Sequence, residues 1–182
     1  MAKFLHQGKM IKSFGYELIR QFPSENTSCD VYLVEKDGRK YIFKSARPND
    51  FLSLSHVRRE HELLTELKEV RGIPEELEFH EGNPFFLVRT YVEGSNVDRW
   101  NKVKGNENLG IISEIVRNLH KRGYVGADLG WSGNVILDSE GAPWVVDLGN
   151  PKKMNDVPRI NTSDFRNLIE GDLSDLRLIC SV

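Results

Sequence analysis

Residues 134–147 read NVILDSEGAPWVVD. Two short β-rich runs, Val135–Leu137 and Trp144–Val146, flank a turn that contains Gly and Pro, and this pattern predicts an antiparallel hairpin. Asn134 stands immediately before the first run and Asp147 immediately after the second. Antiparallel pairing returns both residues to the same end of the hairpin. The sequence therefore predicts an amide and a carboxylate side by side.

A further carboxylate lies just upstream of this hairpin. Asp128 occurs in the turn-rich segment 126–133, and such a segment can return it to the neighbourhood of Asn134. Two carboxylates and an amide are hard oxygen ligands suited to Mg²⁺, which takes its other ligands from phosphate and water. The alternative is that Asp128 and Asp147 only cap local backbone at a turn and a strand end. Both readings stay open at this stage.

The first half of the chain holds a second pair of charged residues. Lys44 alternates with Ile42 and Ala46 on one face of a predicted strand, a face that is otherwise apolar. Glu60 projects from the apolar stripe of an amphipathic helix predicted over roughly 53–70. A partly buried Lys44–Glu60 ion pair is costly unless it positions something. The alternative is that the two side chains reach solvent independently.

The remaining pattern divides the chain into two halves of different character. Strands are predicted over 16–22, 31–34, 41–43, 77–80 and 85–92, and helices over 53–70, over 109–122 and, as one or two short pieces, in the tail 161–182. The predicted class is α+β. Residues 1–92 form a five-stranded antiparallel sheet with one helix, and residues 93–182 form a small, mainly helical part.

Composition and charge disfavour several classes of partner and of structure. The 182 residues are 39% hydrophobic and 29% charged with a formal net charge of -2, so no basic field indicates a nucleic acid or a membrane surface as partner. Cys29 and Cys180 are the only cysteines and lie far apart, which disfavours a disulfide framework. The sequence shows no signal peptide and no apolar run long enough to span a membrane. We expect a cytoplasmic protein.

Five segments, in order and spacing, resemble motifs of the protein-kinase-like superfamily. They are similar to the third-strand lysine motif (41–44), the helix with its glutamate partner (59–64), the fifth strand and hinge (86–94), the catalytic loop (119–134) and the metal-binding Asp-Phe-Gly element (145–149). The short chain looks like the compact branch: RIO-type kinases, the small kinase of the tRNA-modification complex and lipopolysaccharide-core sugar kinases. This resemblance implies a two-lobed fold with a truncated second lobe.

The resemblance also implies a role for each matching residue. Lys44, oriented by Glu60, would hold the α- and β-phosphates of ATP, and Asp128 would accept the proton of the attacking hydroxyl. Asn134 and Asp147 would bind Mg²⁺. The remaining nucleotide contacts would come from Ser28, Val31 and Ile42 and from the backbone of Thr90, Tyr91 and Val92. A tail residue, Asp172, would brace the catalytic loop.

The chain departs from the family pattern in five places, the first of which is Gly126-Ala127-Asp128 where the family has His-Arg-Asp. The phosphate loop, residues 23–29, contains no glycine, and five residues separate Asp128 from Asn134 where the family has four. Leu148 stands at the Phe position of the metal-binding element. After Gly149 only residues 150–182 remain, without the helices that hold protein substrates in ordinary kinases.

These observations lead to an expected function with two alternatives. We expect an ATP- and Mg²⁺-dependent kinase that transfers the γ-phosphate to a hydroxyl group, with protein serine or threonine as the leading acceptor. One alternative acceptor is the sugar of an envelope glycolipid. The other alternative is a pseudokinase that acts as a nucleotide- or partner-binding module, and a protein partner could complete the short second lobe.

Overall fold

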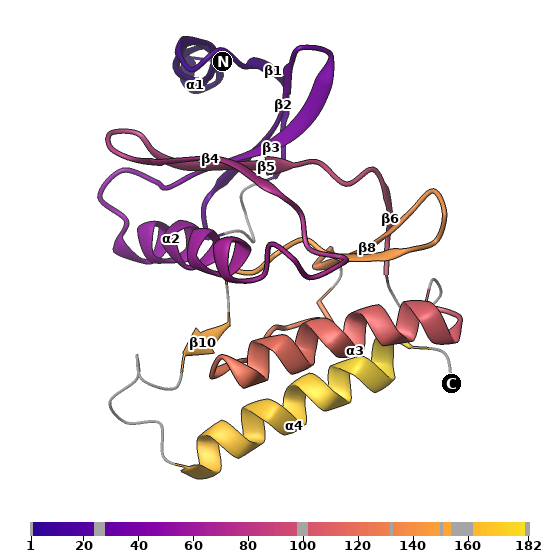
Figure 1. Ribbon diagram of the computed structural model, residues 1–182. Coiled ribbons are helices and arrows are strands. Elements are labelled where there is room, and N and C mark those ends of the chain that lie inside the picture. The colour runs from indigo at the N-terminus through magenta and orange to yellow at the C-terminus, as the bar shows by residue number, and fades with distance from the viewer. Residues whose placement is uncertain are drawn as a thin grey trace. The chain divides into compact units, whose positions relative to one another are not determined.

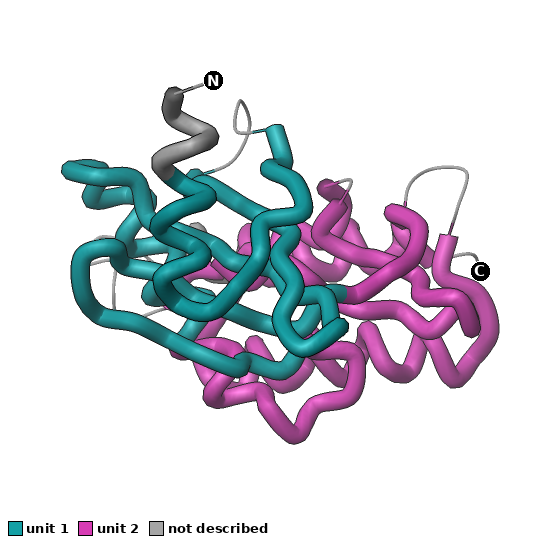
Figure 2. Tube along the Cα trace, turned by 90° about the horizontal axis from the view of Figure 1, so that it is seen from above, with its two compact units in different colours: residues 1–61, 75–91 teal, residues 62–74, 92–182 magenta. Residues whose placement is uncertain are grey.

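The computed structural model describes residues 2–23, 28–97, 102–131, 133–149, 151–153 and 162–180, and the side chains among them except those of 2–6 and 162–166 (Figure 1). The chain divides into two units (Figure 2). Unit 1 comprises Met1–His61 and Glu75–Tyr91, and unit 2 comprises Glu62–Pro74 and Val92–Val182. This division places 62–74 with unit 2, whereas the lobe boundary after residue 92 stays a prediction.

Unit 1 is built on a five-stranded antiparallel sheet with the order β1-β2-β3-β5-β4. Its elements are α1 (Ala2–Ser13), β1 (Glu17–Gln21), β2 (Asp30–Lys36), β3 (Arg39–Ser45), α2 (Phe51–Glu66, which continues into unit 2), β4 (Glu76–Glu81) and β5 (Phe85–Thr90). The Asp37-Gly38 turn joins β2 to β3 with φ of 52° and 73°, as a tight hairpin requires. The predicted strands and helix are confirmed, and α1 is an additional helix.

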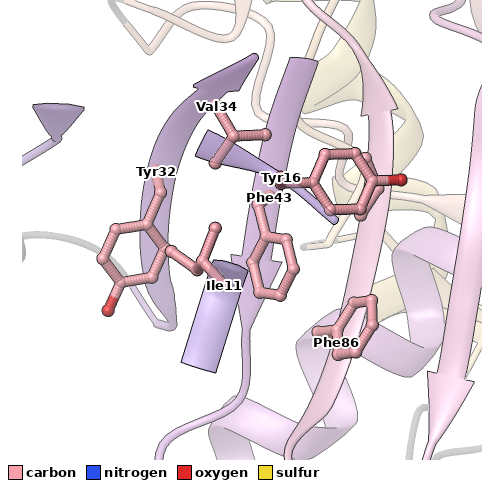
Figure 3. Packing of buried hydrophobic residues seen from close by; sticks show 7 residues of the cluster. Ile11, Tyr16, Tyr32, Val34, Phe43 and Phe86 are labelled. Carbon is pink, nitrogen blue, oxygen red and sulfur yellow. The ribbon is translucent and has the colours of Figure 1, made fainter. Parts of the chain in front are cut away.

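The two faces of this sheet carry different side chains. One face packs Tyr32, Phe43 and Phe86 with Ile11 of α1 in a buried apolar cluster (Figure 3). The rings of Phe43 and Phe86 stack with centroids 4.4 Å apart. The alternate residues of the same strands, among them Lys44, face the side where α2 lies (Figure 1). The period-2 alternation therefore separates an apolar core from a face that carries charge.

Unit 2 combines two long helices with short strands. Its elements are β6 (Gly94–Asn96), α3 (Asn106–Lys121), β7 (Tyr124–Val125), β8 (Val135–Asp138), β9 (Pro143–Val145), β10 (Lys152–Lys153) and α4 (Thr162–Ile179). Helices α3 and α4 lie side by side (Figure 1), and α3 buries its apolar stripe. The tail is thus one helix of 18 residues instead of one or two short ones. Among the described residues, no helix has the length and apolar character needed to cross a bilayer.

The β8–β9 hairpin forms as the sequence predicts. Val135 pairs with Val145 and Ile136 with Trp144. The backbone N–H of Val146 donates to the carbonyl of Asn134 at 2.8 Å, which closes the open end of the hairpin. A hydrogen bond therefore joins the backbone of Asn134 to that of Val146, the residue before Asp147.

Candidate active site

Two buried cations of unit 1, Lys44 and Arg89, meet at the carboxylate of Glu60. Lys44 Nζ lies 2.5 Å from Glu60 Oε2, and Arg89 Nε donates to Glu60 Oε1 at 2.9 Å. All three side chains are buried, with residue exposures of 5%, 2% and 5% for Lys44, Glu60 and Arg89. The predicted Lys44–Glu60 ion pair is confirmed. Two buried cations thus share one buried carboxylate, an arrangement that is costly unless the charges are paired.

Arg89 is the residue that sequence reasoning missed. It lies in β5 within the run 85–89, which is buried throughout. A central strand covered on both faces has no polar alternation, so period-2 analysis gives Arg89 no special place. The available signal was an arginine inside an otherwise apolar strand, because such a residue needs a buried partner.

The predicted nucleotide contacts in unit 1 come from three neighbouring segments. Val31 on β2 pairs with Lys44 on β3, and Ile42 pairs with Arg89 on β5. Ser28 is half-buried in the segment before β2, and residues 24–27 of the predicted phosphate loop lie outside the described residues. Val31 and Ile42 are thus register neighbours of charged residues that surround Glu60.

The backbone of Thr90 is already partly engaged. Its N–H donates to the carbonyl of Glu75 at 2.9 Å, and its carbonyl accepts from Arg89 Nη1 at 3.3 Å. A carbonyl oxygen has a second lone pair, whereas the N–H has no further hydrogen to donate. Any ligand edge at 90–92 would therefore meet the Thr90 carbonyl and the backbone of Tyr91 and Val92.

In unit 2 the catalytic-loop candidate is a closed turn. The N–H of Trp131 donates to the carbonyl of Asp128 at 3.2 Å, and the N–H of Asn134 donates to the carbonyl of Trp131 at 3.1 Å. Asn134 Nδ2 also donates to the Asp128 carbonyl at 2.8 Å. These three bonds hold Asp128 and Asn134 close together. Because Nδ2 of Asn134 already donates to the Asp128 carbonyl, Oδ1 is the side-chain atom of Asn134 that is able to coordinate a cation.

Asp147 follows β9 and is half-buried. Its Oδ1 accepts a hydrogen bond from the N–H of Gly149 at 3.1 Å. After partial burial of the Asp128 carboxyl and the charge of Asp175, the charge of Asp147 also contributes to raising the pKa of Asp128. The hairpin and the loop thus place Asn134, Asp128 and Asp147 in one region of unit 2.

Asp128 itself is exposed and has a φ of 53°. Its pKa is raised, first by partial burial of the carboxyl and then by the charges of Asp175, Asp147 and Asp172. A raised pKa makes a carboxylate a stronger proton acceptor once it is ionised. Perturbation of this kind is common at catalytic acids and bases, and ion-pair networks produce it too.

Asp172 of α4 holds the backbone just before Asp128 by hydrogen bonds. Its carboxylate accepts hydrogen bonds from the N–H groups of Gly126 at 3.0 Å and Ala127 at 2.8 Å. His120 Nε2 lies 2.9 Å from Asp172 Oδ2. The side chain of Asp172 is 2% exposed, so the bonds that it accepts form away from water. The bracing contact expected from Asp172 is confirmed.

The residues present fit a magnesium ion in a restricted sense. Asp147 offers a carboxylate and Asn134 an amide oxygen, and Mg²⁺ commonly binds one or two protein oxygens together with substrate phosphates. Within the described part of the chain, no three His, Cys, Asp or Glu side chains form a complete metal cage. The donor set therefore suits a cation that arrives with a phosphate ligand better than a permanent structural metal.

Comparison with solved structures identifies the fold. The chain has a protein-kinase-like fold, with a five-stranded sheet and a small helical second part, as the sequence predicted. One similar structure is the Cydia pomonella granulovirus kinase PK-1, with a TM-score of 0.61 and 18% sequence identity. The match covers 84% of this chain and 58% of the viral kinase chain. No protein-family model and no curated protein matches the sequence.

Proposed function

We propose that this chain is a phosphotransferase that uses ATP and Mg²⁺ to phosphorylate a hydroxyl group, with protein serine or threonine as the leading acceptor. The observation that carries the proposal is the buried Lys44–Glu60 ion pair on a protein-kinase-like fold. Burial of both ions is unfavourable for stability alone. A role in binding phosphate explains why the ions are kept.

Unit 2 supports the proposal independently. Phosphoryl transfer depends mostly on positioning and on neutralising charge, so it needs an acceptor for one proton and ligands for a metal–phosphate complex. The oxygen of the acceptor hydroxyl would bond to the γ-phosphorus while the bond between that phosphorus and the β-phosphate oxygen breaks. Asp128 would accept the proton that the hydroxyl loses. Asn134 and Asp147 would hold Mg²⁺, which supplies charge neutralisation at the phosphates. Lys44 would contact the phosphates directly.

A second acceptor class is favoured by one observation. Trp131 lies in the loop between Asp128 and Asn134 and is 58% exposed, although its backbone is bonded at both N–H and carbonyl. An exposed indole on a hydrogen-bonded backbone offers a flat apolar surface with a polar N–H at its edge, which suits a ring-shaped acceptor such as a sugar. If the acceptor is a sugar, Trp131→Ala raises KM for it by about tenfold and leaves nucleotide affinity unchanged.

The first experiment measures the thermal stability of the purified protein with ATP, with and without Mg²⁺. A ligand at 100 times its Kd stabilises the folded state by about 2.7 kcal/mol, which raises Tm by several degrees. We expect a Mg²⁺-dependent rise for the wild type that is absent for Asp147→Asn. Asp37→Asn is the matched control, because Asp37 is an exposed aspartate in the β2–β3 turn, and it should respond like the wild type.

Two results contradict the proposal in different ways. If neither protein gains stability, the nucleotide site is absent, and a partner-binding module is the better description. If Asp147→Asn gains as much as the wild type, Asp147 is not a metal ligand. A wild-type response would then be followed by transfer assays with labelled ATP, using a serine/threonine peptide pool and a panel of glycolipid sugars.

A further inference from the structure

We infer that Arg89 is a positioning residue of the proposed nucleotide site, linking the phosphate lysine to the backbone segment that would bind the base. The inference rests on the proposed function and concerns unit 1 alone. Its basis is the way Arg89 divides its donors between the Glu60 carboxylate and the Thr90 carbonyl.

The two oxygens of Glu60 have different partners. Oε2 contacts Lys44, while Oε1 accepts from Arg89 Nε. Glu60 is therefore held to β5 by Arg89 as well as to β3 by Lys44. When Lys44 turns part of its hydrogen-bonding capacity to a phosphate oxygen, Glu60 keeps a cationic partner and is not left as a lone buried charge.

The strand register makes this arrangement rigid. Ile42 pairs with Arg89 and Lys44 pairs with Leu87 in the β3–β5 ladder. Residues directly opposite each other in an antiparallel pair share a face, so Lys44 and Arg89 project from the same face, one two-residue step apart. Both approach Glu60 from the sheet, and neither depends on a loop for its position.

The second end of Arg89 reaches the predicted base-binding segment. Its Nη1 donates to the carbonyl of Thr90 at 3.3 Å. The planar guanidinium carries donors in a fixed geometry, so one side chain can bind the Glu60 carboxylate and the Thr90 carbonyl together, whereas a lysine ammonium has no such fork. Arg89 thus connects the position of Lys44 to that of the last β5 carbonyl.

One ion pair and one histidine–carboxylate contact also hold α2 to the sheet without involving Lys44. Arg58 lies 3.5 Å from Glu81, with both side chains largely exposed, and His61 lies 2.8 Å from Glu76. These contacts help to keep the helix in place, which separates a general bracing role from the specific one assigned to Arg89. Arg58 is therefore the natural control for an arginine that contacts the opposite element but not Glu60.

The test is a double-mutant cycle between Lys44 and Arg89. Affinity for a non-hydrolysable ATP analogue with Mg²⁺ is measured by calorimetry for wild type, Arg89→Met, Lys44→Met and the double variant. We expect Arg89→Met to weaken binding about tenfold when Lys44 is present and less than about twofold when Lys44 is replaced. Arg89→Lys should retain part of the affinity, and Arg58→Met should bind like the wild type.

The outcomes distinguish a failure of the role assigned to Arg89 from a failure of the proposed function. If the wild type binds the analogue and Arg89→Met costs the same with and without Lys44, Arg89 has only a structural role and the inference is wrong. If the wild type does not bind, the proposed function itself fails, and the inference fails with it. Urea unfolding establishes that each variant is folded. Should Arg89→Met not fold, the same cycle is run with Arg89→Lys, where loss of coupling is read in the same way.

Discussion

The carboxylate of Asp172 accepts a hydrogen bond from the backbone N–H of Ala127, 45 residues earlier, at 2.8 Å. One helix in the tail thereby determines the backbone position immediately before the proposed proton acceptor, Asp128. The bond is charge-assisted and buried, a combination that makes hydrogen bonds stronger than neutral ones.

Replacement of Asp172 should destabilise the protein and lower transfer together. Asp172→Asn keeps the size of the side chain but presents an NH₂ group or a neutral oxygen to two backbone donors, and we expect a loss of about 2–3 kcal/mol in unfolding free energy. Urea denaturation measures the loss. Glu170→Gln is the control, because Glu170 is exposed on the same helix, and it should change stability by less than about 0.5 kcal/mol.

The ionisation of Asp128 should cost stability at neutral pH. Its pKa is raised in the folded protein, so the folded state binds the proton more tightly than the unfolded chain does. Stability from this residue is therefore present at low pH and falls as pH rises from the ordinary carboxyl pKa through the raised one. Asp128→Asn should be more stable than wild type at pH 7, with the difference vanishing in acid.

The control for this experiment is Asp37→Asn. Asp37 and Asp128 are both exposed aspartates with positive φ, 52° and 53°, and asparagine tolerates that conformation well. A stability gain seen equally in both variants would mean that backbone preference, not charge repulsion, is responsible. Transfer by Asp128→Asn should be abolished, while nucleotide binding stays near wild type.

Removal of a neighbouring charge should shift the pH profile of transfer. Asp175 is the largest electrostatic contributor to the raised pKa of Asp128. Asp175→Asn removes a negative charge and so favours the ionised form of Asp128, which moves the acidic limb of kcat/KM to lower pH. The profile is measured across the acidic range. An unchanged acidic limb would show that Asp128 is not the group that titrates.

The three buried charges that meet at Glu60 should not be equally important for folding. Glu60→Gln removes the carboxylate that Lys44 and Arg89 share, and we expect a loss of about 3–5 kcal/mol in unfolding free energy. Lys44→Met leaves Glu60 with Arg89, so it should cost at least about 1 kcal/mol less. Glu81→Gln breaks an exposed pair with Arg58 and should cost less than about 1 kcal/mol. Equal losses for Glu60→Gln and Lys44→Met would contradict the shared pairing.

Gly72 should be far less replaceable than Gly141. Both have positive φ, +85° and +80°, but an added Cβ at Gly72 would lie 2.8 Å from the carbonyl oxygen of Pro143 and 2.8 Å from Ile111 Cγ2, whereas Gly141 has open space around it. Alanine at either position incurs the strain of the left-handed region, about 1 kcal/mol. Gly72→Ala should cost at least about 2 kcal/mol more than Gly141→Ala in thermal or urea unfolding.

Local patterns were sufficient for most of the fold. Alternation and turn residues located the five strands and the β8–β9 hairpin, and the 3.6-residue period located α2 and α3. Helix α1 was missed because Gly8 lies in its middle and, of its described side chains, only Ile11 is fully buried. A helix that contributes so little apolar surface has no clear periodic stripe.

Two kinds of position in the candidate site could be predicted from the sequence: residues that flank a hairpin, and charged residues on an apolar face. Asn134 and Asp147 flank a hairpin, and Lys44 and Glu60 occupy apolar faces, so topology brings each pair together. The contact of Asp172 with Ala127 joins positions 45 residues apart, and only the family resemblance pointed to it. Arg89 could not be assigned a partner from sequence, because its role depends on the β3–β5 register and on the rotation of α2.

The loop from Asp128 to Asn134 is bonded to itself at its two ends, while Asp172 anchors the backbone before it and the β8–β9 hairpin anchors the backbone after it. Both backbone bonds inside the loop are made by the main chain of Trp131, so a change of its side chain leaves these bonds in place. Under the proposed function, exchange of the Trp131 side chain therefore changes the surface offered to the acceptor, while the ends proposed to accept the proton and to bind the metal keep their positions.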